Sequence, residues 1–253
     1  MLLLLQTLIV FVHVDSFINT FMGAVMAKRL RKEREDMLQD RLPILDKIYN
    51  TCVSNYPVNS IIPRSADVFL DPFVQDLITC PPLSATFTDK NLAAVETTFP
   101  DIVLRWRKQA EEKLLNMITQ GCGIQTTSEF VLQLATTVFT CKYCIDDPLT
   151  YPRVLVHRCA TRIFYSDRED EDMPSIRRFL DCAYWNIGNV ITFEAQRTVV
   201  LTKAIKLCGL DPMSATREDI EKKWPIFECL ACNDPRKGRC TLSWLGVVCC
   251  FLW

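Results

Sequence analysis

Two cysteines and one histidine near the middle of the chain have the residue types and the spacing of metal ligands. Cys141 and Cys144 are separated by two residues, and twelve further residues separate Cys144 from His157. A Cys-x-x-Cys pair can close a tight loop around one ion, and this return to histidine matches the first half of a Cys2His2-type zinc site. The segment therefore predicts a structural metal site, with zinc as the expected ion.

The fourth ligand of this site is open in the sequence, because no second histidine follows His157 at the usual spacing. Cys159 and Cys182 are the candidates. Pro152 suits the first turn of a helix, and we expect a short helix over residues 152–163 that presents His157 inward. Residues two apart on a helix point to different faces, so Cys159 can bind the same ion only if this helix starts late or is distorted.

A second Cys-x-x-Cys pair, Cys229 and Cys232, follows in the last quarter of the chain. Thirteen cysteines in 253 residues give about 0.6 pairs at any one spacing by chance, so one pair alone would carry little weight. Both pairs are followed by Asp-Pro and then by an apolar patch that ends in a potential ligand, which here is Cys249 or Cys250. We interpret the two segments as a degenerate repeat; the alternative is that the cysteines are buried, inert thiols.

The elements around these pairs are expected to be helical. The sequence predicts a mainly α fold with one or two small zinc-knuckle (ββα-like) modules in the C-terminal half. Prolines should keep the helices within residues 42–100 short. Capping residues and apolar spacing predict helices over 43–54, 71–79, 101–120, Thr127 or Ser128 to about Val138, 193–208 and 217–223, with an acidic loop over 166–174. The residues expected to mark helix ends are Asp71 as an N-cap, Gly121 after residue 120, Gly209 after residue 208, and Thr216 to Asp219 as a capping-box-like start.

We divide the chain into three segments. Residues 1–40 form a hydrophobic and then charged N-terminal helix, residues 41–138 an α-helical domain, and residues 139–253 a cysteine-rich region with two knuckles joined by a helical segment. Residues 1–27 are the most hydrophobic stretch. They are expected to form a buried or partner-facing helix; a membrane anchor and a signal peptide are the alternatives. From Lys28 on, mixed charges predict an exposed helix in which Arg29 pairs with Glu33.

Overall charge and cysteine usage limit the class of protein. A net charge of −1 and a pI near 6.2 disfavour a dedicated nucleic-acid binder, which usually has a basic excess. That function is kept as an alternative, with Arg153, Arg158 and Arg162 as the contacting residues. An odd number of cysteines without any Asn-x-Ser/Thr acceptor favours reduced thiols and a cytosolic or nuclear location.

The motifs of several enzyme classes are absent. The chain has no His-Glu-x-x-His, no glycine-rich phosphate loop, no Gly-x-Ser-x-Gly elbow and no kinase signature. It also lacks the His-x-Glu motif that precedes Pro-Cys-x-x-Cys in zinc deaminases. We therefore expect no catalysis and infer no small-molecule substrate. Four tryptophans are expected to lie in the core or to pack against the knuckles rather than to stack on bases, namely Trp106, Trp185, Trp224 and Trp244.

The order of these motifs resembles a large group of uncharacterised cysteine-rich proteins from mushroom-forming (basidiomycete) fungi. The matching residues are Arg41-Leu-Pro43, Trp106-Arg107, Cys141-x-x-Cys144, Leu155-Val-His157-Arg-Cys159, Cys208-Gly-Leu-Asp-Pro212, Ala215-Thr216, Cys229-x-x-Cys232, Gly238-Arg239 and Leu242-Ser-Trp244. The resemblance implies a zinc-finger-like module in an adaptor or regulatory protein. In such relatives a histidine-bearing helix follows the position of Trp244, where this chain has Cys249 and Cys250, and a truncated carboxyl end is one explanation.

These observations favour a non-enzymatic, intracellular protein stabilised by structural zinc that binds another macromolecule, which we expect to be a protein. Filling a Cys/His site can supply on the order of 10 kcal/mol of folding free energy. The alternatives are a zinc-finger-type nucleic-acid-binding regulator and a protein anchored to a membrane through residues 1–27.

Overall fold

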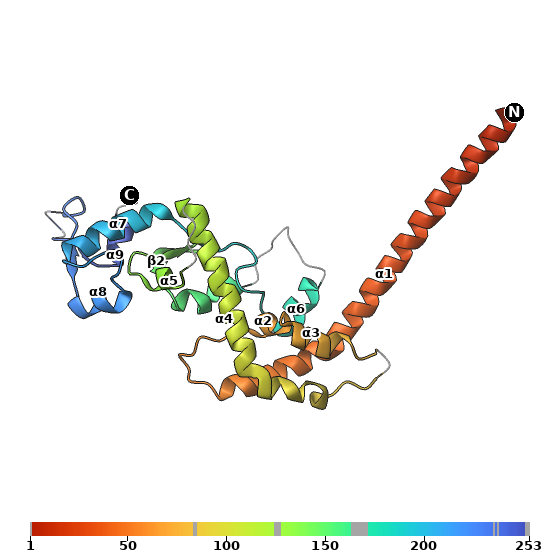
Figure 1. The fold of residues 1–253 in the computed structure, drawn as a ribbon, viewed down its shortest axis with the longest axis horizontal. Coiled ribbons are helices and arrows are strands. Elements are labelled where there is room, and N and C mark those ends of the chain that lie inside the picture. The colour runs from red at the N-terminus through yellow and green to blue at the C-terminus, as the bar shows by residue number, and fades with distance from the viewer. Residues whose placement is uncertain are drawn as a thin grey trace.

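The computed structural model describes residues 2–82, 85–123, 128–162, 172–234, 236 and 238–250; at residues 2–17, 145–147 and 249 it describes the backbone alone. The described chain is mainly helical, with two small antiparallel sheets (Figure 1). This agrees with the predicted α-rich fold. The three-segment division at residues 40 and 138 stays a prediction.

The first helix, α1 (Leu2–Ser54), is far longer than expected. The helix predicted over 43–54 is its last part, because α1 continues through Pro43. A proline inside a helix costs about 3 kcal/mol. Here the neighbouring side chains of Leu42 and Leu45 are completely buried and offset that loss.

The N-terminal half of α1 extends away from the rest of the protein (Figure 1). Residues 18–32 are all exposed, so the expectation that residues 1–27 form a buried helix is wrong for 18–27. A partner-facing role stays a prediction. Among the described residues, no helix has a stretch long and apolar enough to cross a membrane. The expected pair between Arg29 and Glu33 is present at 2.8 Å.

An N-terminal core forms where the end of α1 packs against α2, α3, the first half of α4, and α6. The bounds are α2 (Ser65–Phe69), α3 (Pro72–Thr79), the 3-10 turn η1 (Asp89–Leu92), α4 (Ala93–Cys122) and α6 (Met173–Leu180). Asp71 caps α3 as predicted, accepting the N–H of Phe73 at 3.1 Å. Arg34 clamps α1 to α6 through two hydrogen bonds to Asp172, at 2.5 and 2.6 Å.

Helix α4 connects this core to a second one. It begins at Ala93, before the expected start at residue 101, continues through Pro100, and ends at Cys122, where Gly123 adopts φ +68° as its cap. The glycine at which we expected the end, Gly121, has a different role. A Cβ atom there would lie 2.7 Å from the ring of Phe193, so the missing side chain lets α4 approach the sheet closely.

The middle core lies between α4 and a three-stranded antiparallel sheet of order β2-β1-β3. Its elements are α5 (Phe130–Gln133), β1 (Phe139–Cys141), β2 (Cys144–Leu149), the 3-10 turns η2 (Arg153–Val156) and η3 (Arg158–Thr161), and β3 (Ile191–Phe193). The helix expected up to Val138 is reduced to the single turn of α5. Most of the expected acidic loop, residues 166–171, lies outside the described residues, and α6 begins within its last part.

A C-terminal core forms between α7, α8 and α9, beside the hairpin β4-β5. The bounds are α7 (Ala195–Leu207), α8 (Arg217–Lys223), β4 (Ile226–Glu228), β5 (Thr241–Ser243) and α9 (Gly246–Cys250). Two predicted helix boundaries are confirmed: Gly209 follows α7 with φ +68°, and Thr216 and Asp219 form a capping box at α8. Helix α9 also contacts β2, so the C-terminal core adjoins the sheet that carries the first cysteine pair.

Three of the four tryptophans are buried as expected, in the middle core (Trp106 and Trp185) and in the C-terminal core (Trp244). Trp224 is the exception, because its side chain is 79% exposed. It adopts a left-handed conformation with φ +44° at the end of α8, which turns the chain toward β4.

Candidate metal centres

The first cysteine pair lies on the hairpin of β1 and β2. Cys141 ends β1, Cys144 begins β2, and the two are register partners across the turn. The backbone N–H of Tyr143 donates to the Cys141 sulfur at 3.4 Å, which holds that sulfur against the turn. The residue before β3 holds the same turn, because the N–H of Lys142 donates to the carbonyl of Val190 at 3.0 Å. Both cysteines are thus positioned by the sheet.

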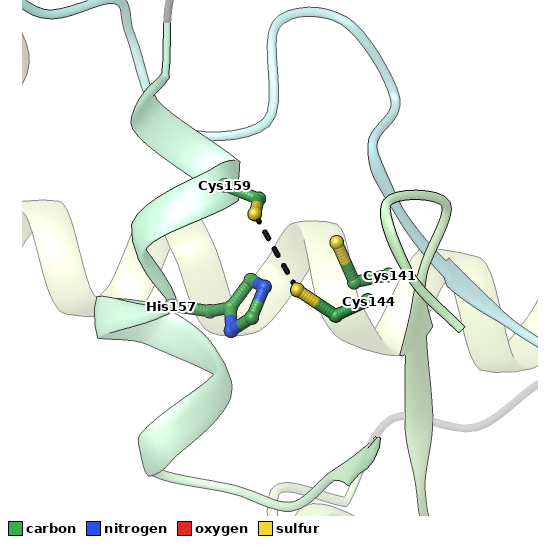
Figure 2. A group of neighbouring side chains, drawn as sticks. All are labelled: Cys141, Cys144, His157 and Cys159. Carbon is green, nitrogen blue, oxygen red and sulfur yellow. Dashed lines mark hydrogen bonds between the residues drawn. The ribbon is translucent and has the colours of Figure 1, made fainter. Parts of the chain in front are cut away.

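The histidine reaches this pair from a broken segment, not from a helix. The helix predicted over 152–163 is wrong: η2 and η3 are separate 3-10 turns, and His157 lies between them with φ −63° and ψ 122°. Val154 and Leu155 are buried in the middle core and hold η2 there. The extended residue at 157 redirects the chain, so that His157 and Cys159 both face the hairpin (Figure 2).

Four potential ligands therefore meet at one point, which we call the first centre: Cys141, Cys144, His157 and Cys159. One ligand atom from each lies within 4.8 Å of all the others. The Sγ atoms of Cys144 and Cys159 are 3.6 Å apart, close to the separation of about 3.8 Å between two thiolates on a tetrahedral zinc with 2.3 Å bonds. Cys141 and Cys159 are buried. The residues could hold a metal ion, and of the two candidate fourth ligands it is Cys159 that lies beside the other three.

Cys182, the other candidate fourth ligand, lies elsewhere. Its sulfur is 3.5 Å from the hydroxyl of Ser65, within the N-terminal core. Burial raises the pKa of this thiol, as expected of a cysteine that serves as a small core residue. It is not part of the first centre.

Crowding of thiols opposes ionisation in the first centre. Hydrogen bonding to Cys159, together with burial, raises the pKa of Cys144 to about 11. Several thiolates cannot form side by side without a positive charge to balance them, and a divalent cation supplies that charge. The arrangement can therefore bind a cation and release protons as it does so.

The second cysteine pair belongs to a similar cluster, which we call the second centre. Cys229 and Cys232 lie just after β4, and Cys250 approaches them from α9; one ligand atom from each lies within 4.8 Å of the others. The Sγ atoms of Cys232 and Cys250 are 3.1 Å apart. Hydrogen bonding with Cys229 raises the pKa of Cys250 to about 12, whereas the pKa of Cys229 is lowered, mainly by its hydrogen bond with Cys250. The side chain of Cys249, the other predicted ligand, lies outside the described residues.

A cysteine that the sequence analysis did not select lies beside the second centre. Cys240 directly precedes β5, and its carbonyl accepts the N–H of Cys229 at 2.9 Å. It was missed because it belongs to no Cys-x-x-Cys pair. The strand signal on either side of the loop, Ile226–Glu228 and Thr241–Ser243, could have indicated that a hairpin brings it back.

The three arginines of the nucleic-acid alternative are exposed on and after η2 and η3. Arg158 and Arg162 line one hollow together with Arg64, but Asp46 and Asp181 line it too. Arg153 lines a neighbouring hollow. The nucleic-acid alternative stays a prediction.

A scan against models of protein families finds no match to this chain. Searches of curated proteins and of solved structures also find no significantly similar protein.

Proposed function

We propose that this protein is a non-enzymatic adaptor whose helical body is stabilised by structural zinc and which binds another protein. The observation that carries the proposal is the convergence of three cysteines and one histidine in the first centre. The ligands come from two sides of the middle core, so one ion would tie the hairpin β1-β2 to the turns η2 and η3.

The donor set favours zinc. Thiolates are soft ligands that select Zn²⁺, Cu(I) or iron–sulfur clusters, and a set of three cysteines and one histidine around one point is a common structural zinc site. The 3.6 Å separation of Cys144 and Cys159 suits one tetrahedral ion.

The same donor set favours a structural role over a catalytic one. A catalytic zinc keeps one coordination position open for water or substrate, whereas four protein ligands occupy a tetrahedral ion completely. Two of the four ligands, Cys141 and Cys159, are only 3% and 2% exposed, which leaves little access for a substrate.

A protein partner is supported by apolar surface around the second centre. A groove of about 440 Å³ is lined by side chains of α7, α9 and the hairpin β4-β5, among them Leu207, Leu230 and Val247. Leu207 and Leu230 are 81% and 80% exposed. Apolar surface of this kind is typical of protein–protein contacts.

Cobalt substitution of the full-length protein tests the structural zinc. We expect intense d–d absorption typical of tetrahedral cobalt, together with a thiolate-to-cobalt charge-transfer band. Adding halide or azide should leave the d–d bands unchanged, because no position is open to an outside ligand. A five- or six-coordinate spectrum, or one that changes with azide, would contradict a closed structural site.

Binding through the groove is tested by cross-linking full-length protein in cells and identifying the captured proteins. Leu230→Asp should lose the wild-type partners, whereas Val58→Asp, at another exposed apolar position outside the groove, should keep them. Capture of the same proteins by both variants would contradict this surface as the binding site.

A further inference from the structure

The second centre has three ligands in the described part of the chain, one fewer than a structural tetrahedral zinc requires. We propose that Cys240 is the fourth, which completes a four-cysteine set with Cys229, Cys232 and Cys250. This inference rests on the proposed metal binding, and it assigns a ligand by strand register.

The register of the hairpin puts Cys240 directly opposite Cys229. Strands β4 and β5 pair Phe227 with Leu242 and Glu228 with Thr241, and one further step along the ladder pairs Cys229 with Cys240. The hydrogen bond from the Cys229 N–H to the Cys240 carbonyl, at 2.9 Å, shows that the pairing continues to this step. Residues directly opposite in an antiparallel pair have Cβ atoms about 4.5–5.5 Å apart. Two thiols with this Cβ spacing can reach the separation of about 3.8 Å on one zinc without a backbone shift.

The alternation of the strands directs both cysteines to the face where Cys250 lies. Side chains two apart on a strand share a face, so Cys229 lies with Phe227, and Cys240 with Leu242. Phe227 and Leu242 line the same groove as Cys250. The sulfur of Cys240 is not among the ligand atoms that already lie within 4.8 Å of one another, so binding the ion requires its side chain to turn toward Cys229.

Hydrogen bonds hold the backbone of Cys240 in this place. Its N–H donates to Oδ1 of Asn233 at 2.8 Å, and the amide nitrogen of Asn233 donates to Glu228 at 2.7 Å. Asp234 and Gly238 exchange backbone hydrogen bonds of 3.2 and 2.7 Å, which close the loop between Cys232 and Cys240. Protein contacts thus hold the backbone of Asp234, Gly238 and Cys240 next to the second centre.

Four thiolates on one Zn²⁺ leave a net charge of −2, which cations nearby can offset. Lys203 lines the groove next to Cys229 and Cys250, and Arg239 directly precedes Cys240. Arg239 also lies 3.6 Å from Glu228. Because Glu228 pairs with Arg239 and lines the same groove, the positive charge near the proposed ion comes chiefly from Lys203.

The test is the zinc affinity of the second centre in full-length protein, measured by competition with a chromophoric chelator under reducing conditions. Cys240→Ser should weaken the second zinc by about 100-fold or more, as the loss of a direct ligand exceeds the 10–100-fold effect of outer contacts. Cys229→Ser is the positive control for loss. Cys249→Ser, the competing assignment, and Cys208→Ser, outside both centres, should stay within about threefold of wild type.

A cadmium-113 NMR spectrum reads the ligand set directly, whether or not affinity changes. The resonance of the ion in the second centre should move upfield in Cys240→Ser, because one thiolate ligand is lost. It should stay in place in Cys249→Ser. The inference is overturned if Cys249→Ser shows the loss and Cys240→Ser does not, or if wild type binds metal only at the first centre. Both of these results leave the proposed structural zinc intact, whereas wild-type protein without any metal would overturn the proposed function itself.

Discussion

Cys144 and Cys159 place their sulfur atoms 3.6 Å apart, although one begins a β-strand and the other lies on a 3-10 turn (Figure 2). Their approach depends on the extended residue His157, which separates two short turns where a continuous helix was expected. On a continuous helix, Cys159 would point away from His157. The break is therefore what allows both residues to face the hairpin.

Removal of one buried ligand should destabilise the middle core. We expect Cys159→Ser to lower the free energy of unfolding by about 3 kcal/mol or more, which for a chain of this size lowers Tm by roughly 6–12 °C. The measurement is thermal unfolding with and without a strong chelator. Cys122→Ser, at an exposed cysteine outside both centres, should match wild type. Equal melting of Cys159→Ser and wild type in the absence of chelator would contradict a structural ion.

Metal affinity should rise steeply with pH. A thiol must lose its proton to bind an ion, and the pKa of Cys144 is raised to about 11 because hydrogen bonding to Cys159 and burial favour the thiol. A thiol that is protonated in the metal-free protein releases one proton when it binds the ion. Each released proton makes the apparent metal affinity rise tenfold per pH unit. Chelator competition at pH 6, 7 and 8 should show at least this tenfold step. A flat profile over this range would show that the thiols do not bind the ion.

Asp67 should make stability depend on pH in the opposite direction. Burial raises its pKa to about 6, against about 4 in the unfolded chain. The folded state therefore favours the protonated carboxyl. The stability that this protonation adds to the folded state is fully present below pH 4 and is lost as the pH rises to 6 and above. The free energy of unfolding of Asp67→Asn, taken relative to that of wild type, should therefore rise on the order of 2–3 kcal/mol between pH 4 and pH 7.

This change is checked by urea unfolding of wild type and Asp67→Asn at each pH. Both proteins lose metal to the same extent as the pH falls, so that effect cancels in the difference between their free energies of unfolding. In wild type the backbone N–H of Trp185 donates to Asp67 at 2.8 Å. The side-chain amide oxygen in Asp67→Asn can still accept this hydrogen bond. A difference between the two proteins that does not vary with pH would contradict the raised pKa.

Gly121 should be intolerant of a side chain. Gly121→Ala places a Cβ atom 2.7 Å from the ring of Phe193, which packs edge-on against Phe139 on the strand that carries Cys141. We expect a loss of about 1–3 kcal/mol, the usual cost of overpacking. Gly23→Ala in α1 is the matched control, because nothing lies within 4 Å of its Cβ position and alanine favours a helix. Equal stability of the two variants in urea unfolding would refute the close approach of α4 to β3.

Local signals in the sequence were sufficient to predict several helix ends. The cap at Asp71, the capping box of Thr216 and Asp219 and the glycine after α7 depend on hydrogen bonds between near neighbours, so their residue types are sufficient to locate them. The spacing of Cys141 and Cys144 indicated one side of the first centre for the same reason, because the tight turn between β1 and β2 fixes that pair.

The features that could not be predicted depend on contacts between distant segments. Pro43 was expected to begin a helix, but packing of Leu42 and Leu45 into the N-terminal core keeps α1 continuous. Cys240 has no local motif, and only the pairing of β4 with β5 places it opposite Cys229. A helix over 152–163 was expected because Pro152 suits a first turn, yet burial of Val154 and Leu155 in the middle core favours two separate turns.

The most direct test of the account is the metal content per chain of protein purified without added metal, by elemental analysis and native mass spectrometry, for wild type and Cys141→Ser. We predict two zinc ions in wild type and one in Cys141→Ser, since only the first centre contains Cys141. Wild-type protein that is folded, reduced and free of zinc would contradict the account.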